Sequence, residues 1–100
     1  MVTVGLMLRI DAQPDKADEV EAMLTAAVEK IQREDTTPVW LALRLGPTSF
    51  AVVDAFPDEA GRQAHLAANA DALARAADEL LTRPPSIERT DVVAAKLPNQ

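Results

Sequence analysis

Two neighbouring segments that are apolar on both faces most constrain how this chain can fold. Residues 39–45 and 49–56 alternate like strands, and a Gly-Pro-Thr turn joins them. In the first segment, one face carries Val39, Leu41, Leu43 and Leu45, and the other face carries Trp40 and Ala42. In the second segment, one face carries Phe50, Val52 and Phe56, and the other face carries Ala51, Val53 and Ala55. Helices cover one face of such a sheet, and a bare apolar sheet face is unusual in a soluble monomer. We therefore expect a second copy of the chain to cover the other face in a two-fold dimer.

The first third of the chain predicts a strand followed by a helix. Residues 2–11 alternate between apolar and more polar positions, as a half-buried strand does. Residues 15 to about 34 carry apolar side chains at spacings of three and four. Asp15 is the expected N-cap of this helix, because a short polar side chain can accept hydrogen bonds from the first backbone N–H groups.

The last part of the chain predicts a second helical region and a final strand. Pro57 and Asp58 open the helical region, Asn69-Ala70-Asp71 is expected to divide it into two shorter helices, and Arg83-Pro84-Pro85 ends it. Residues 86–97 are expected to form a strand centred on Val92 to Ala95. The order is that of a ferredoxin-like βαββαβ fold of the α+β class, an antiparallel sheet with its helices on one face.

The size and composition fit one small domain. With 100 residues, of which 48% are hydrophobic, the chain can build one core, and we assign residues 1–97 to it and residues 98–100 to a C-terminal tail. A net charge of -6 disfavours nucleic acid and anionic membranes as partners. The apolar start of the chain is interrupted by Arg9 and Asp11, so it is too short to span a membrane. The absence of cysteine favours the cytoplasm.

Two stretches resemble the antibiotic biosynthesis monooxygenase family. LRIDAQPDKADEVEAML is similar to that family's first strand and helix, and FAVVDAFPDEAGRQAHLAAN resembles its third strand and second helix. The family tends to have an acidic residue and an aromatic near the end of that strand and a histidine on the helix; Asp54, Phe56 and His65 fall at those places. The resemblance implies a dimeric α+β barrel that oxidises hydroxylated aromatics or quinols with O2, without metal, flavin or haem.

His65 and Asp54 are the candidate catalytic residues. His65 is the only histidine, and its pKa near neutrality suits a proton acceptor if the ring points between helix and sheet. Otherwise it sits half exposed at the edge of the apolar stripe of its helix. Asp54 lies in an apolar strand, where it could orient His65, act as the base itself, or form a salt bridge with Arg44 or Arg9. A lone histidine without cysteine does not make a metal site, so we expect no metal.

Trp40, Arg44, Phe56 and Asn69 are the candidate substrate-binding residues. Trp40 could stack on a flat aromatic ligand, or fill the core or a dimer interface. Arg44 shares its strand face and could stabilise an anionic phenolate, or pair with Asp54 or with an acidic residue of a second copy of the chain. Asn69 follows His65 by one helical turn and could bind a substrate hydroxyl or cap a helix. Phe56 is a candidate because it falls at the aromatic position of the family that the chain resembles.

These residues leave three functions open. The first is a cofactor-independent monooxygenase acting on a small hydroxylated aromatic molecule or quinol. The second is a non-catalytic dimeric barrel that binds a small apolar molecule, which the aromatic content of only 3% favours because few side chains can stack on a ring. The third is an isomerase or cyclase that uses the same pocket and base without O2.

Overall fold

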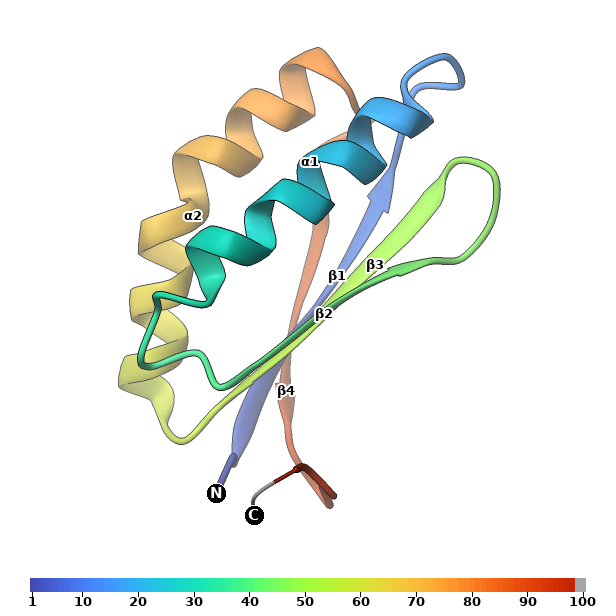
Figure 1. Ribbon diagram of the computed structural model, residues 1–100. Coiled ribbons are helices and arrows are strands. Elements are labelled where there is room, and N and C mark those ends of the chain that lie inside the picture. The colour runs from blue at the N-terminus through green and yellow to red at the C-terminus, as the bar shows by residue number, and fades with distance from the viewer. Residues whose placement is uncertain (99–100) are drawn as a thin grey trace.

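A sheet of four strands carries both helices on one face (Figure 1). The structure is a computed structural model that describes residues 1–98; residues 99 and 100 of the expected tail lie outside the described residues. The elements in chain order are β1 (Val4–Asp11), α1 (Ala17–Ile31), β2 (Val39–Arg44), β3 (Ser49–Phe56), α2 (Glu59–Glu79) and β4 (Ser86–Asp91). The strands lie in the order β2-β3-β1-β4, and all neighbours are antiparallel. The predicted ferredoxin-like βαββαβ fold is confirmed.

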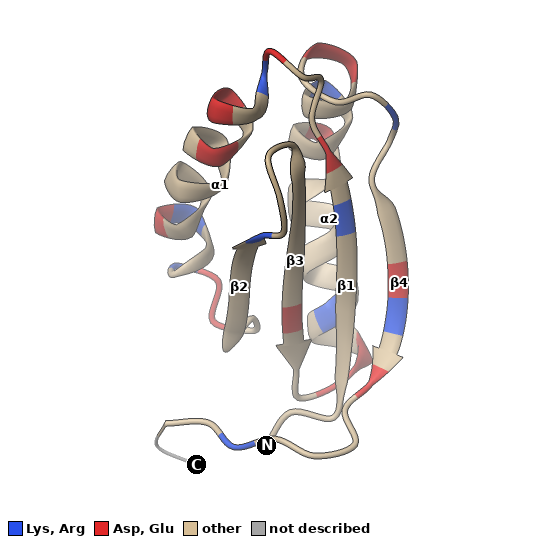
Figure 2. Cartoon of the chain, turned by 90° about the vertical axis from the view of Figure 1, so that its right-hand side faces the viewer, with Lys and Arg blue, Asp and Glu red and all other residues tan. Residues whose placement is uncertain are grey.

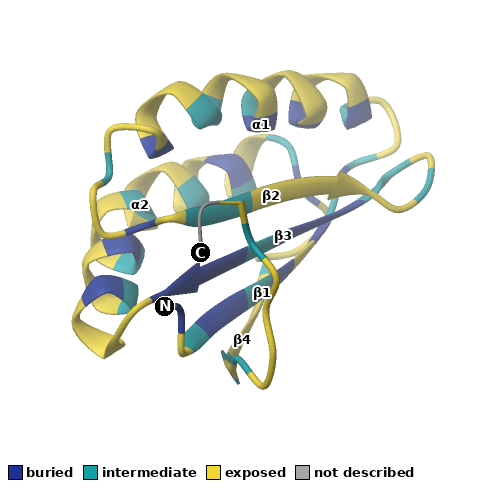
Figure 3. Cartoon of the chain, turned by 60° about the horizontal axis from the view of Figure 1, so that its bottom comes forward, coloured by how far each residue is buried: buried dark blue, intermediate teal, exposed yellow. Residues whose placement is uncertain are grey.

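The core lies between the two central strands and the helices. Figure 3 shows β1 and β3 largely buried, while β2 and β4 form exposed edges. The apolar side chains that fill the core include Leu6, Leu8 and Ile10 of β1, Val20 and Leu24 of α1, and Phe50, Val52 and Phe56 of β3. Burial of such side chains stabilises a fold by about 25 cal/mol per Å² of apolar area. The core therefore holds β3 and α2, which carry Asp54 and His65, in a fixed relationship.

Both helices differ from the prediction in detail. The N-cap position of α1 is Lys16, without a side-chain cap, so the prediction of Asp15 was wrong. The expected break in the second helical region is also wrong, because α2 runs without interruption from Glu59 to Glu79. The Asn69 amide donates a 2.8 Å hydrogen bond to the backbone oxygen of His65, one turn earlier in the same helix. Its side chain therefore bonds within the helix instead of ending it.

The last strand is shorter than predicted. β4 pairs only with β1 and ends at Asp91, which lies opposite Val4, the first residue of β1. The final ladder contact is the hydrogen bond from Val92 N to Thr3 O, at 2.9 Å. The apolar residues from Val92 to Ala95 therefore lie outside the strand, because β1 offers no backbone for them to pair with.

The face of the sheet opposite the helices is apolar and uncovered in the single chain. Figure 2 looks onto this face, where charged positions are sparse along β2 and β3. Leu41 and Leu43 of β2 are 55% and 45% exposed, and Val53 and Met7 beside them are half-buried. Among the described residues, neither helix is long and apolar enough to cross a membrane.

Candidate functional site

His65 lies between two carboxylates. It sits on the face of α2 that packs toward β3 and is only 7% exposed. Its Nε2 atom lies 2.8 Å from Oδ2 of Asp54 on β3, and its Nδ1 atom lies 2.6 Å from Oε1 of Glu34. The ring of Phe56 packs against the imidazole, with 5.4 Å between ring centroids. The imidazole therefore links a carboxylate of the sheet to one in the connection between α1 and β2.

Polar side chains hold the Glu34 carboxylate in place. Thr37 Oγ1 donates to Oε1 at 2.9 Å, and Asn69 Nδ2 donates to Oε2 at 3.2 Å. Burial alone would raise the pKa of Glu34, but the hydrogen bonds from His65, Asn69 and Thr37 outweigh it and lower the pKa below its usual range. Glu34 is therefore an ionised and well-satisfied carboxylate.

Asp54 is more deeply buried and much less satisfied. It is 1% exposed, in the middle of an apolar strand. Its Oδ2 atom faces His65 Nε2 at 2.8 Å, whereas its Oδ1 atom has no hydrogen-bond partner among the described residues. A buried carboxylate without hydrogen bonds is destabilising, and such groups in folded proteins call for an explanation such as a ligand or a catalytic role. Oδ1 of Asp54 can therefore accept a hydrogen bond that residues 1–98 do not supply.

The two carboxylates favour the protonated form of His65. Burial by itself would lower the pKa of His65, and the contacts with Asp54 and Glu34 more than compensate, so that the pKa is raised above its usual value. An imidazole donates from both nitrogens only when it is protonated. The raised pKa of His65 therefore favours a ring that points one N–H at each carboxylate. Because Asp54 and Glu34 lie on opposite edges of the ring, they do not converge, and residues 1–98 contain no cluster of three or more such side chains suited to a metal ion.

A cavity of about 100 Å³ lies beside Asp54 and His65, between the helices and the sheet. Its wall is mostly apolar and consists of Leu8, Ile10, Met23, Leu24, Ala27, Ile31, Trp40, Val52, Asp54, His65, Asn69, Ala72 and Leu73. A closed apolar cavity of about 150 Å³ holds one benzene ring. The cavity of about 100 Å³ therefore has room for a molecule smaller than one aromatic ring, or for part of a larger one.

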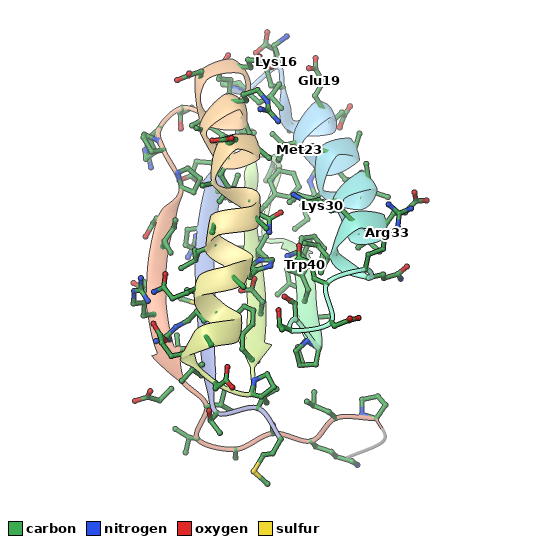
Figure 4. All side chains as sticks on the ribbon, turned by 90° about the vertical axis from the view of Figure 1, so that its left-hand side faces the viewer. Lys16, Glu19, Met23, Lys30, Arg33 and Trp40 are labelled. Atoms are coloured by element: carbon green, nitrogen blue, oxygen red, sulfur yellow. The ribbon has the colours of Figure 1, made fainter. Side chains whose placement is uncertain are left out.

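Trp40 separates this cavity from two open hollows. In Figure 4, Trp40 is seen between the two helices, toward the end of α1 that carries Lys30. One hollow, of about 500 Å³, lies between α1 and β2 and is lined by Phe50 and Arg44. The other, of about 390 Å³, is lined by Glu34 and the residues around it. The indole borders all three spaces and is partly buried, so it forms the wall between the cavity and the two hollows.

The structure brings together four of the six candidate site residues. Asp54, His65, Asn69 and Trp40 line one cavity. Arg44 lies in the hollow on the far side of Trp40, where its guanidinium is 3.0 Å from Glu21 and 5.1 Å from the centre of the Phe50 ring. The alternative of an Arg44–Asp54 salt bridge is therefore wrong, because Trp40 is the residue of β2 that faces Asp54 in the sheet register. The ring of Phe56 packs against the ring of His65, but Phe56 does not line the cavity.

The sequence analysis missed Glu34 and Thr37. Glu34 is one of several acidic residues in and after α1, and no local pattern distinguishes it from the others. It lies 31 positions before His65 in the chain, and only the packing of α2 beside the end of α1 brings the two side chains together. The only sign of Glu34 and Thr37 in the sequence was that both lie in a short polar segment between a predicted helix and a predicted strand.

Comparison with known proteins supports the fold. No protein-family model and no curated protein matches the chain. A solved structure of a protein of unknown function from Nitrosomonas europaea is 42% identical, with a TM-score of 0.95, covering 100% of this chain and 98% of the other. A Caulobacter crescentus protein named as a candidate antibiotic biosynthesis monooxygenase is 22% identical, with a TM-score of 0.74, covering 93% and 92%. An antibiotic biosynthesis monooxygenase is 18% identical, with a TM-score of 0.76, covering 91% and 99%. The chain therefore belongs to the same family as the Nitrosomonas europaea protein, and its fold is that of the antibiotic biosynthesis monooxygenases.

Proposed function

We propose that this protein is a cofactor-independent monooxygenase that oxidises a hydroxylated aromatic molecule or quinol with O2. The observation that carries the proposal is the buried Asp54 carboxylate beside an apolar cavity, whose Oδ1 atom has no hydrogen-bond donor among residues 1–98. A phenolic hydroxyl supplies that donor, and its proton is the one that must leave for the reaction to start. The fold shared with proteins named as antibiotic biosynthesis monooxygenases supports the same chemistry.

In this reaction Asp54 takes the phenolic proton, and the electron-rich phenolate then reduces O2 without help from a metal or flavin. For a simple phenol, one ring C–H becomes C=O and the second oxygen atom leaves as water. The substrate loses four electrons and O2 gains four, so phenol and O2 give quinone and water. The proton held by Asp54 returns to the departing oxygen. The protonated His65, 2.8 Å from Asp54, stabilises negative charge while the proton moves.

The apolar wall of the cavity excludes water, which strengthens these charge interactions. The cavity of about 100 Å³ is too small for a two-ring substrate in this structure. We therefore include in the proposal that the Trp40 side chain swings toward the neighbouring hollow when substrate binds. Asn69 also lines the cavity, and because its N–H groups bind Glu34 and the His65 backbone oxygen, its Oδ1 atom accepts from a second substrate hydroxyl.

The proposal includes a homodimer that forms through the uncovered face of the sheet. Leu41 and Leu43 give β2 an exposed apolar surface, which continues onto Val53 and Met7. Two copies packed through this face would bury it and form an α+β barrel. Because the sequence contains no cysteine, the cytoplasm is the location that we propose.

A second candidate function is the non-catalytic binding of a small apolar molecule. The observation that favours it is the volume of the cavity, about 100 Å³, which fits a molecule smaller than one aromatic ring without any movement of Trp40. An isomerase or cyclase would use the same base and is distinguished by a product that contains no new oxygen.

Oxygen uptake with a series of naphthohydroquinones tests the proposal, with spontaneous oxidation in buffer subtracted. We expect saturable uptake by the purified protein and a loss of most of it in His65→Ala. The matched control is Asp71→Asn, which changes an exposed residue of α2 and should retain full uptake. Binding of the hydroquinone without uptake above the buffer rate would support the second candidate instead. Equal uptake by His65→Ala would remove His65 from the mechanism.

A further inference from the structure

We propose that Glu34 is the positioning residue of this site: it keeps His65 protonated and directs the Nε2 edge of the imidazole to Asp54. This inference rests on the proposed function, because it concerns the proton that Asp54 exchanges with a substrate. Glu34 itself does not border the cavity and so acts through His65.

The geometry around Glu34 is that of a strong, fixed contact. The distance of 2.6 Å from Oε1 to His65 Nδ1 is shorter than the usual 2.7–2.9 Å of a charge-assisted hydrogen bond. Thr37 and Asn69 hold the two carboxylate oxygens from two different directions. Lys30 of α1 donates to the Asn69 side-chain oxygen at 3.2 Å and thereby fixes the amide that binds Glu34. Glu34 is therefore a rigid anchor for one edge of the ring.

The two edges of the ring are unequal. Glu34 is bound by three side chains, whereas the one polar side-chain contact of Asp54 within residues 1–98 is His65 Nε2. Because groups other than His65 also hold Glu34, it fixes the Nδ1 edge of the ring and leaves the Nε2 edge facing Asp54. The proton between His65 Nε2 and Asp54 is the one that lies at the cavity.

The other groups around the ring do not compete for this role. From β3 the ring meets Asp54 and Phe56; from the connection after α1 it meets Glu34 and Thr37. Asn69, the neighbour on α2 itself, is uncharged. Lys30 reaches the network only through Asn69. Within residues 1–98, the charged groups in contact with the imidazole are these two carboxylates.

Nitrogen-15 NMR of the wild-type protein tests this directly, because the sequence contains a single histidine. We expect both ring nitrogens of His65 to be protonated at neutral pH. A ring with one nitrogen deprotonated at neutral pH would overturn the proposal, and this measurement needs no variant.

Glu34→Gln and Glu29→Gln form a matched pair for a pH titration followed by the same NMR signals. Both remove one negative charge, but Glu29 is an exposed residue of α1 without a contact to His65. We expect the titration midpoint of His65 to move to lower pH in Glu34→Gln and to stay at the wild-type value in Glu29→Gln. If the two variants titrate alike, Glu34 does not hold the proton on the ring. Circular dichroism of both variants checks that they fold.

The activity readout separates this proposal from the proposed function. In Glu34→Gln we expect kcat/KM for hydroquinone oxidation to fall about tenfold, the loss of one hydrogen bond to a charged group. Its pH profile should shift in the same direction as the NMR midpoint. If the wild-type protein shows no oxygen uptake, the proposed function fails while the NMR titration still decides the role of Glu34. If uptake is robust but Glu34→Gln keeps the wild-type pH profile, only the positioning role fails.

Discussion

The Nε2 atom of His65 lies 2.8 Å from Oδ2 of Asp54, joining α2 to β3 at the wall of an apolar cavity. Neither residue is accessible from outside, since Asp54 is 1% and His65 7% exposed. A charged pair in this position has less solvent to stabilise it than a surface pair and can interact strongly with a substrate proton. The relationship between these two residues is the basis of the proposed chemistry.

Asp54→Asn should remove the proton acceptor while preserving the shape of the site. We expect the rate of hydroquinone oxidation to fall by about a hundredfold or more, the usual contribution of a general base. Oxygen uptake by this variant and by the surface control Asp71→Asn provides the comparison. A rate for Asp54→Asn equal to that of wild type would contradict the assignment of Asp54.

The stability of the protein should depend on pH through His65 and Glu34. The raised pKa of His65 contributes stability that is complete below its usual value of 6.5 and is lost as the pH rises through the higher folded value. The lowered pKa of Glu34 contributes stability above its usual 4.5, lost as the pH falls through the lower folded value. Urea unfolding should therefore show the largest contribution of this pair between these two usual values, 4.5 and 6.5.

His65→Gln is the control for this pH dependence. Its stability should not decline on the alkaline side as that of the wild type does, because the variant has no imidazolium to lose. A wild-type protein whose free energy of unfolding rises with pH above 6.5, relative to His65→Gln, would show that the pKa of His65 is not raised in the folded state.

The sequence predicted the fold well because the fold depends on local patterns. Alternation of apolar residues marked the strands, and spacings of three and four marked the helices. The helix break expected at Asn69 failed because the amide bonds to the backbone oxygen of His65 in its own helix and to Glu34. Local propensity does not show whether a side chain has such a tertiary partner.

The site was predictable only in part. Asp54 and His65 stood out as polar residues in or beside apolar stretches, and the structure brings them together. Glu34 carried no such signal, because its role comes from contact with a residue 31 positions away. Arg44 was expected as a possible partner of Asp54, but the register of β2 against β3 places Trp40 there instead. A register is set by the whole sheet and cannot be derived from one strand.

Gly5 should be sensitive to substitution because two strands approach it closely. A Cβ atom added at this position of β1 would lie 2.7 Å from the backbone oxygen of Asp54 and 2.8 Å from Thr90 Oγ1. Since the backbone of β3 cannot move easily, we expect Gly5→Ala to lower the free energy of unfolding by about 1–3 kcal/mol. Gly46→Ala is the control, since an added Cβ there meets nothing within 4 Å. Equal urea midpoints for both variants would contradict this reading of Gly5.

A charge on the open face of the sheet should separate the proposed dimer. Leu41→Lys adds an ammonium group at a position that is 55% exposed in the single chain, so the fold of each copy should survive. Light scattering should give twice the mass of the chain for wild type and the mass of one chain for Leu41→Lys. Ala22→Lys, on the exposed side of α1, should remain dimeric. A wild-type protein that is monomeric at micromolar concentration would refute the dimer.

Trp40 should report ligand binding through its fluorescence. It is the only tryptophan in the chain and borders the cavity and both hollows. We expect 1,4-naphthoquinone, the oxidised form of a test substrate, to shorten the fluorescence lifetime of Trp40 in a saturable manner. Free N-acetyltryptophanamide at the same concentrations gives the collisional effect alone. A linear response identical to that of the free compound would mean that no ligand reaches Trp40.

Incubation of the purified protein with a naphthol under ¹⁸O2, followed by mass spectrometry, tests the central claim most directly. The account predicts a quinone product that carries one ¹⁸O atom, formed by wild type and Asp71→Asn and nearly absent with Asp54→Asn. Recovery of unlabelled or unchanged naphthol from the wild-type reaction, or equal labelling by Asp54→Asn, would contradict it.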